Sequence, residues 1–460
     1  MIVEYTNIKR INGPLIMLEG VDDVSFEELV EIQMDNGETR LGNVVDVSQG
    51  LAVIQVFEGT RSLALGNCTS KFLGKPLEIG LSTEVLGRIF NGAGRPSDGL
   101  GPIYTKVRRD VNGSPINPIS RKYPRNYIRT GISSIDGLVT LIRGQKLPIF
   151  SGNGLPHDQL AAQIVKQAGL GKSDEKFAVV FAAIGIKYDV AEFFKKSFEE
   201  SGVLENVAMF INLTSDPPVE RIFTPRCALT AAEYLAFEEG YHVLVVLTDM
   251  TAYCEALREI SSSRGEIPSR KGYPGYLYSD LASIYERAGM IEGLEGSITQ
   301  IPILTMPNDD INHPIPDLTG YITEGQIVLD RGLSQKGIYP PLAILPSLSR
   351  LMKDGIGEGY TREDHSPVAN QLFSSYSKVE EVRALASVIG EEELSQDDKA
   401  YMEYGRAFEE QFLTQGFNEN RSIDETLDLG WQLLGLLKPE AIDRIDPDII
   451  EKYGHLMKKA

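Results

Sequence analysis

One short stretch, residues 151–158, has the spacing of a phosphate-binding loop but lacks its chemistry. A working P-loop reads G-x-x-x-x-G-K-[ST], so that backbone N–H groups, a lysine and a hydroxyl hold a Mg²⁺-bound triphosphate. Here Pro156, His157 and Asp158 occupy the positions of the second glycine, the lysine and the hydroxyl. Proline has no N–H to donate, neutral histidine is no ammonium clamp, and a carboxylate repels phosphate. We predict that this degenerate loop is non-functional as a nucleotide-binding site, and its candidate positions are Gly152, Gly154, His157 and Asp158.

The segments around this loop are nevertheless typical of a nucleotide-binding fold. An apolar strand is predicted at residues 147–150 and a helix follows from residue 158. Between residues 130 and 330, continuous apolar runs alternate with helical patterns, which indicates a parallel sheet covered on both faces. The apolar runs are residues 177–184, 207–213 and 242–249, and the helical patterns include 230–239 and 253–261.

The two ends of the chain follow different patterns. Short strands are predicted at residues 11–18, 29–34, 39–47 and 51–57, and strands at this spacing favour a small barrel. Amphipathic helices are predicted at residues 378–389, 397–413 and 423–437. The expected fold class is α/β. Its predicted domains are an N-terminal β-barrel at 1–75, a nucleotide-binding-type α/β domain at 76–358 and a C-terminal helical domain at 359–460.

Two further residues could take part in phosphate chemistry, and each has a plainer interpretation. Asp249 ends an apolar strand, where a carboxylate can help to hold Mg²⁺, but such an aspartate is more often a helix N-cap, and we favour that role. Arg350 is the one charged residue in an apolar, proline-rich segment, residues 340–351. It is either an ordinary surface arginine or a guanidinium delivered to a γ-phosphate in a neighbouring protein chain.

The composition excludes several classes of function. The formal net charge is −20 and there is no basic tract, so nucleic acid is not expected as a partner. No apolar run is long enough to span a membrane. The three cysteines and five histidines are scattered without metal-ligand spacing, so we expect no metal site in this chain.

Long motifs in a fixed order resemble the B subunit of V-type and A-type rotary ATPases over essentially the whole chain. The motifs that carry the resemblance are residues 130–136, 143–148, 150–157, 228–236, 255–260, 302–307, 314–326 and 345–350. Catalytic subunits of such enzymes end one strand in Gly-Glu-Arg, whereas this chain reads Gly185-Ile186-Lys187. Isoleucine cannot orient the attacking water. The chain also departs from the family at Tyr360, where relatives often have a lysine that could contact nucleotide.

The resemblance implies a RecA-like central domain and a non-catalytic, regulatory role in a ring where three such chains alternate with three catalytic A subunits. Central-stalk and peripheral-stalk subunits are the other implied partners. ATP or ADP with Mg²⁺ is expected at the A–B boundary, held mainly by the partner, with Arg350 reaching in as an arginine finger. Thr319 and Ser347 are predicted as further contacts to that nucleotide.

The resemblance also implies a place on the cytoplasmic face of a membrane, peripheral and without insertion. It does not decide between H⁺ and Na⁺ as the transported ion, or between synthesis and pumping. The alternative function is a stand-alone NTPase with an atypical phosphate loop. A ring ATPase of flagellar or secretion systems is disfavoured, because those proteins keep an intact Gly-Lys-Thr.

Overall fold

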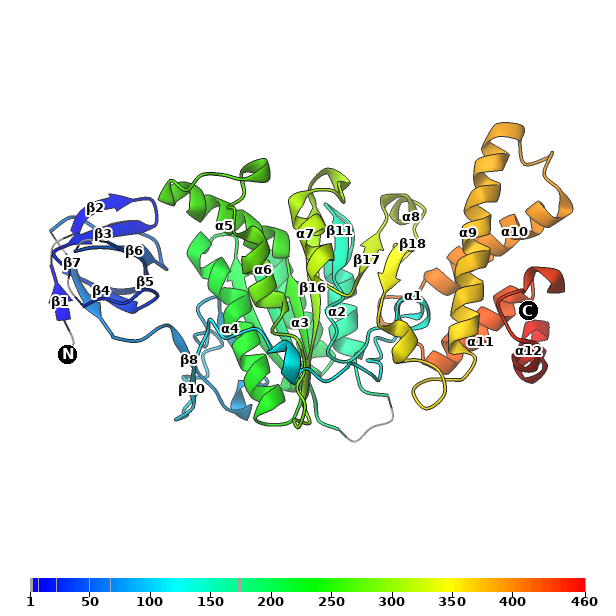
Figure 1. Ribbon diagram of the computed structural model, residues 1–460, viewed down its shortest axis with the longest axis horizontal. Helices are drawn as coiled ribbons and strands as arrows, with labels where there is room; N and C mark the ends of the chain where they lie inside the picture. The colour runs from blue at the N-terminus through cyan, green and yellow to red at the C-terminus, as the bar shows by residue number, and fades with distance from the viewer. Residues whose placement is uncertain are drawn as a thin grey trace. The chain divides into compact units, whose positions relative to one another are not determined.

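The computed structural model describes residues 3–6, 8–21, 23–48, 50–66, 68–171 and 175–459 (Figure 1). It divides into two compact units. Unit 1 comprises residues 1–120, 178–298 and 317–322, and unit 2 comprises residues 121–177, 299–316 and 323–460.

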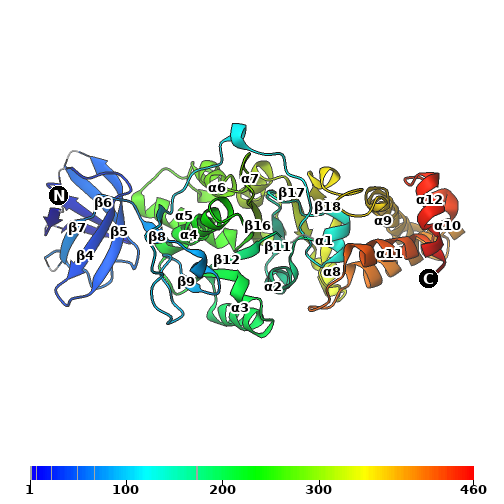
Figure 2. The same cartoon turned by 90° about the horizontal axis from the view of Figure 1, so that it is seen from below.

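The N-terminal part of unit 1 is an antiparallel β-barrel. Its strands run in the order β1-β7-β4-β5-β6-β3-β2 (Figure 2). Their bounds are β1 Val3–Tyr5, β2 Ile8–Asn12, β3 Leu15–Glu19, β4 Leu29–Met34, β5 Thr39–Ser48, β6 Leu51–Val56 and β7 Cys68–Phe72. Buried positions alternate with more exposed ones along β4 and β5. The core of the barrel includes the fully buried side chains of Val30 and Ile32 in β4, Val44 in β5 and Ile54 in β6. Short β8 (Glu78–Gly80) and β10 (Arg108–Asp110) pair separately.

The single strand predicted over residues 11–18 is wrong. The structure has a hairpin there, in which Asn12 of β2 pairs with Leu15 of β3. Gly13 and Pro14 form the turn, and Gly13 has a φ of +56°, which glycine adopts without strain. The hydrophobic pattern runs through this turn, so the pattern alone did not mark the reversal. The other predicted strands match β4, β5 and β6 to within a residue.

The rest of unit 1 is an α/β layer. Its main strands run in the order β14-β12-β13-β9, and the β12–β13 and β13–β9 pairs are parallel. The strands are β9 Ile89–Asn91, β12 Phe177–Ile186, β13 Val207–Leu213 and β14 His242–Thr248, and β15 is Gly289–Met290. The helices are α3 Tyr188–Glu200, α4 Pro218–Phe237, α5 Met250–Arg264 and α6 Leu277–Tyr285. Phe181 of β12 packs on Phe194 and Phe198 of α3, so the buried strand and its covering helix share one aromatic cluster.

Unit 2 holds a second group of strands, in the order β18-β17-β11-β16. They are β11 Ile149–Gly152, β16 Ser297–Met306, β17 Gly325–Leu329 and β18 Leu342–Ser349. Strand β11 is parallel to β16 and β17, whereas β18 is antiparallel to β17. The helices of this part of unit 2 are α1 Ser133–Leu138, α2 His157–Gln167 and α8 Arg331–Gln335. Helix α7 is Pro314–Ile322, and its residues 317–322 belong to unit 1.

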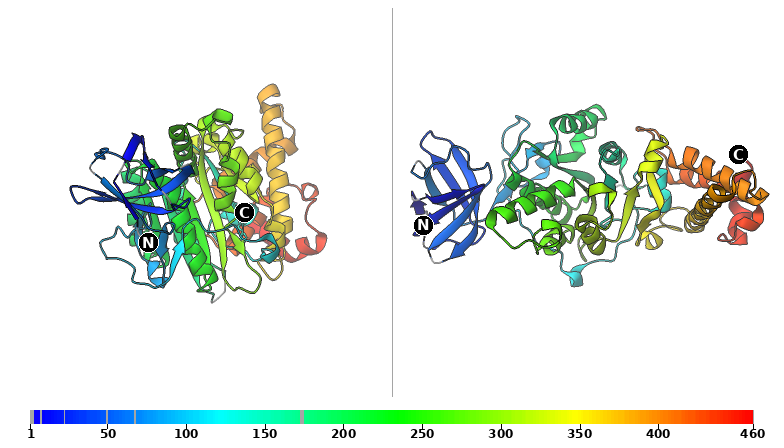
Figure 3. Two further views of the ribbon diagram at one scale, coloured as in Figure 1. Left: turned by 60° about the vertical axis from the view of Figure 1, so that its left-hand side comes forward. Right: turned by 90° about the horizontal axis from the view of Figure 1, so that it is seen from above.

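The C-terminal part of unit 2 is helical (Figure 3). Its helices are α9 His365–Ile389, α10 Gln396–Ala407, α11 Ile423–Leu434 and α12 Pro447–Tyr453, with a π-helix at Phe408–Leu413 between α10 and α11. The three predicted helices all exist. The first begins 13 residues earlier than predicted, at His365, because its first half carries polar residues that contact the rest of unit 2 and weaken the periodic pattern. Within the described residues, no helix is long and apolar enough to cross a bilayer.

Candidate functional site

The degenerate phosphate loop has the local geometry of a strand–turn–helix unit. Strand β11 ends at Gly152, Gly154 supplies a left-handed turn with φ of +80°, and α2 begins at His157. Pro156 occupies the N-cap position, and no side chain caps the helix. Asp158 lies in the first turn of α2, where its negative charge complements the positive end of the helix dipole. Asp158 stands at the position where a working loop has its Mg²⁺-binding hydroxyl, so a negative charge replaces that hydroxyl.

The side chains of the loop bind to neighbouring protein groups. The His157 ring turns back toward β11, with Nδ1 3.0 Å from the Ser151 hydroxyl. Arg331 donates to the Asn153 carbonyl at 2.9 Å and forms an ion pair with Asp309 at 2.8 Å. The hydrogen bond from Arg331 lowers the pKa of Asp309, which keeps the carboxylate charged. A Cβ atom built on Gly152 would collide with the Asp309 carboxylate. The loop is thus covered by an aspartate that sequence analysis did not select.

Two positions at strand ends in unit 1, Ile186 and Asp249, were considered above for roles in phosphate chemistry, and neither has such a role in the structure. Ile186, at the end of β12, is buried. The Asp249 carboxylate accepts from the Thr251 N–H at 2.7 Å and caps α5, so the predicted N-cap role is confirmed.

Arg350 directly follows β18 and is exposed. Its backbone N–H donates to the Glu324 carbonyl at 2.9 Å. Its guanidinium makes one long hydrogen bond, from Nη1 to the Thr323 carbonyl at 3.5 Å. Within the part of the chain that the structure describes, no carboxylate forms an ion pair with Arg350. The backbone is fixed while most guanidinium donors face solvent.

The other two predicted nucleotide contacts have different surroundings. The Ser347 hydroxyl is buried. It accepts a hydrogen bond from the Val328 N–H at 2.9 Å and donates one to the Ala343 carbonyl at 2.6 Å. These bonds occupy backbone groups at the point where the pairing of β17 and β18 shifts register. Thr319 is buried in α7 of unit 1, with its hydroxyl 3.4 Å from the Tyr285 hydroxyl. Nucleotide contact by Ser347 or Thr319 stays a prediction, and it requires these buried hydroxyls to become accessible.

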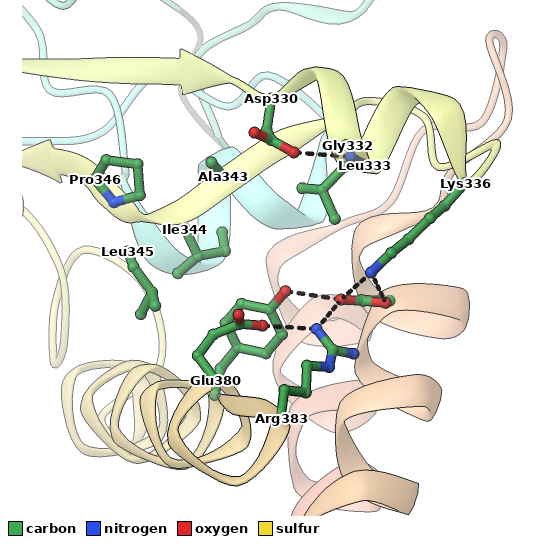
Figure 4. Close-up of a pocket in the computed structure, with 12 residues that line it drawn as sticks. Asp330, Gly332, Leu333, Lys336, Ala343, Ile344, Leu345, Pro346, Glu380 and Arg383 are labelled. Atoms are coloured by element: carbon green, nitrogen blue, oxygen red, sulfur yellow. Dashed lines mark hydrogen bonds and ion pairs between the residues drawn. The ribbon is translucent and has the colours of Figure 1, made fainter. Parts of the chain in front are cut away.

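A cavity of about 310 Å³ lies behind β18, between α8, α9 and the π-helix (Figure 4). Glu409 of the π-helix accepts from the Tyr376 hydroxyl at 2.9 Å, from Arg383 at 2.6 Å and from Lys336 at 3.3 Å. Burial raises the pKa of Glu409, but the Arg383 hydrogen bond and charge outweigh it, so the pKa is below its usual value. The charges on this wall of the cavity therefore neutralise one another.

The motif from Tyr360 to His365 forms a buried network at the start of α9. Asp364 is fully buried and accepts two hydrogen bonds from Arg362, at 2.7 and 2.9 Å, and one from the Trp431 indole at 2.7 Å. His365 Nε2 lies 3.1 Å from the Gly137 carbonyl, so this nitrogen carries the proton. Burial lowers the pKa of His365 to about 4, which keeps the ring neutral. The hydrogen bonds of Asp364 and His365 therefore hold the start of α9 in place, and we assign these two residues a structural role.

Three features together define a class of protein: a β-barrel, an α/β core with a P-loop-type turn, and a C-terminal helical domain. Residues 8–71 match the β-barrel domain of the ATP synthase alpha/beta family, and residues 131–349 match its nucleotide-binding domain. Residues 354–454 match the C-terminal domain of V and A type ATP synthase. The chain has the architecture of an ATP synthase alpha/beta-type nucleotide-binding subunit.

Comparison with individual relatives identifies the group within the ATP synthase alpha/beta family to which the chain belongs. The chain is 67% identical over 452 residues to the V-type ATP synthase beta chain 2 of Clostridium tetani, covering 98% of each protein. It is 59% identical over 450 residues to the A-type ATP synthase B subunit of Aeropyrum pernix, covering 98% of this chain and 97% of that protein. A solved structure, a unique ATP synthase subunit NeqB from Nanoarcheaum equitans, aligns with a TM-score of 0.72 at 42% identity, covering 92% of this chain and 98% of that one. The chain belongs to the family of V-type and A-type ATP synthase beta chains, also called B subunits, which confirms the predicted resemblance and three-part fold.

Proposed function

We propose that this chain is the non-catalytic, regulatory subunit of a V/A-type ATP synthase, and that its Arg350 completes the nucleotide site of a neighbouring catalytic chain. The observation that carries the proposal is the state of Arg350. Its backbone is anchored, its side chain is exposed, and no carboxylate in the described residues competes for its guanidinium. An arginine with these properties can bind phosphate oxygens without first breaking an ion pair.

The chain's own loop supports the non-catalytic part of the proposal. Asp158 places a negative charge in the first turn of α2, the Asp309–Arg331 ion pair lies against Gly152 and Asn153, and the His157 ring lies within hydrogen-bond distance of the Ser151 hydroxyl. This donor set does not fit a Mg²⁺–triphosphate, which needs a lysine and a hydroxyl here. We therefore assign the Mg²⁺ and most contacts to ATP or ADP to the catalytic partner.

The proposed partners follow from family membership. In the proposed assembly the chain alternates with catalytic A subunits in a closed ring. Contacts between unlike faces of neighbouring subunits form such a ring when the rotation from one subunit to the next closes on itself. Central-stalk and peripheral-stalk subunits complete the assembly, on the cytoplasmic face of the membrane. Sedimentation of this chain with its catalytic partner tests the ring directly. Separate species, with or without nucleotide, would contradict it.

The test of the arginine finger is ATP turnover by the assembled complex. Arg350→Ala should lower kcat by about 10³-fold or more, because a trans arginine stabilises charge that develops in the transition state. Arg350→Lys should restore little, since an ammonium lacks the planar fork.

Arg109→Ala is a matched control. Arg109 is also exposed, but it is already paired with Glu238 at 3.0 Å in unit 1, so its removal should leave turnover unchanged. Near wild-type turnover in Arg350→Ala, with the ring intact by gel filtration, would refute the proposal. ATP hydrolysis by the purified chain alone, in contrast, would support the alternative of a stand-alone NTPase.

A further inference from the structure

The residue that anchors Arg350, Glu324, is itself held by a buried lysine. Lys146 is only 3% exposed. Its ammonium pairs with Glu324 Oε1 at 2.8 Å, and its backbone N–H donates to Glu324 Oε2 at 2.9 Å. In return, the Glu324 N–H donates to the Lys146 carbonyl at 3.2 Å. Three bonds thus join position 146, just before β11, to position 324, just before β17.

The backbone carbonyl of Glu324 connects this pair to Arg350 through hydrogen bonds. It accepts the Arg350 N–H at 2.9 Å and also a hydrogen bond from Gln145 Nε2 at 3.2 Å. A displacement of Glu324 would therefore move the acceptor that fixes the Arg350 backbone.

Gln145 fixes the residue before the arginine as well. It is fully buried, and its Nε2 donates to the Ser349 hydroxyl at 2.9 Å. Its Oε1 accepts from the Ile142 N–H at 2.9 Å, so the amide orientation is determined by its partners. The Ser349 hydroxyl in turn donates to the Thr140 carbonyl at 2.8 Å. Both sides of the Ser349–Arg350 peptide are therefore tied to the turn at residues 140–146.

We propose that Gln145 and Lys146 are positioning residues for Arg350, and that they set the point from which its guanidinium extends. The inference rests on the proposed arginine-finger function. Among the described residues, the guanidinium of Arg350 is bound only by the long hydrogen bond to the Thr323 carbonyl. The position that the guanidinium can reach therefore depends on where the Arg350 backbone is held. A misplacement of about 1 Å at a catalytic group can cost about 10²-fold in rate.

The first variants remove the anchor without touching Arg350. Lys146→Met deletes the charge that holds Glu324. Gln145→Glu is isosteric and keeps the acceptor for Ile142, but it loses both donors, to Glu324 and to Ser349. In the assembled complex each should lower kcat about 10- to 100-fold, whereas KM for ATP changes by less than about threefold, because an arginine that acts in the transition state adds little to ground-state binding. Lys146→Arg keeps the charge, so its loss of kcat should be smaller than that of Lys146→Met.

Arg143→Met is the matched control for a buried cation in the same turn. Arg143 is nearly as buried as Lys146 and pairs with Glu175 at 2.7 Å. That pair does not include Glu324 or Arg350. Arg143→Met should lower the free energy of unfolding as much as Lys146→Met does, and should leave kcat within about twofold of the wild-type value. Equal losses of kcat in the two variants would show a general stability effect and overturn the inference.

A double-mutant cycle with Arg350→Ala separates this inference from the proposed function. If Lys146 acts through Arg350, Lys146→Met should have almost no further effect on kcat in the Arg350→Ala background. The same 10- to 100-fold loss in both backgrounds would overturn the positioning role while leaving the arginine finger intact. No loss in Arg350→Ala alone would refute both.

Hydrogen exchange of the isolated chain tests the geometry without turnover. The Arg350 amide should exchange at least tenfold faster in Lys146→Met than in wild type or Arg143→Met. Unchanged protection of that amide in Lys146→Met would overturn the positioning role, because the anchor would then not depend on the lysine.

Discussion

Arg362→Met should weaken the C-terminal helical part of unit 2 more than any surface charge change does. Its partner Asp364 is 0% exposed and accepts both hydrogen bonds from Arg362. Removal of one partner of a buried ion pair costs about 3–5 kcal/mol, because the other charge stays buried without compensation. The Trp431 indole still donates to Asp364, so we expect the lower end, about 3 kcal/mol. Arg362 also forms an ion pair with Asp428, but Asp428 is partly exposed, so the loss of this pair adds little to the cost in stability.

The sequence supplies a local probe for this prediction. Trp431 is the only tryptophan of the chain, and it lies in the affected network. Its fluorescence during urea unfolding reports this part of the molecule. With an m-value of about 2 kcal/mol/M, a loss of about 3 kcal/mol lowers the urea midpoint by about 1.5 M.

The control for this experiment is Arg406→Met. Arg406 pairs with Glu391 at 3.4 Å on the surface, with both side chains more than 60% exposed. Such pairs contribute close to nothing, so the midpoint should stay at the wild-type value. A midpoint in Arg362→Met that lies within about 0.3 M of this control would refute the claim that burial of Asp364 determines the cost.

Three further predictions concern nucleotide binding, pH and backbone geometry. Isothermal titration of the purified chain with Mg-ATP should show weak binding at best, because Asp158 is negative in the first turn of α2 and Asp309 lies directly against Gly152; sub-micromolar affinity that His157→Ala abolishes would contradict this. The folded pKa of His365 is about 4, below its unfolded value of 6.5. Its contribution to stability is therefore complete above pH 6.5 and is lost as the pH falls toward 4, on the order of 3 kcal/mol in total. His365→Gln should flatten this part of the pH profile of Trp431-detected unfolding, and an unchanged slope would exclude His365 as its source. Gly325 has a φ of +143°, and a Cβ there would collide with the Leu348 carbonyl. Gly325→Ala should therefore separate β17 from β18 and increase hydrogen exchange at Arg350, whereas wild-type exchange would show that the strands tolerate the side chain.

The sequence predicted the architecture well where the signal is local. The continuous apolar runs of β12, β13 and β14 and the periodic helices after residue 363 follow from side-chain alternation and helical spacing, which neighbouring residues encode. The hairpin at Gly13 was missed because an apolar run continues through the turn. The π-helix before α11 was missed because its sequence reads as ordinary helix. The domain boundaries at residues 75 and 358 stay predictions.

For the site, the sequence by itself determined what is missing. Pro156, His157 and Ile186 lack the N–H, the ammonium and the carboxylate of phosphate chemistry, and no tertiary arrangement can supply a group that a side chain does not contain. Arg350 could also be selected from sequence, as a lone charge in an apolar segment.

Only the tertiary structure decided how these residues are surrounded. Asp309 covers Gly152 from 157 positions further along the chain, and Lys146 holds Glu324 from 178 positions away. Such contacts leave no periodic or spacing signal, because they depend on which strands become neighbours in the folded sheet and not on residues nearby in sequence. Whether an arginine is paired or free is likewise a property of its folded neighbourhood. The structure leaves the Arg350 backbone anchored and its guanidinium without an acidic partner among the described residues.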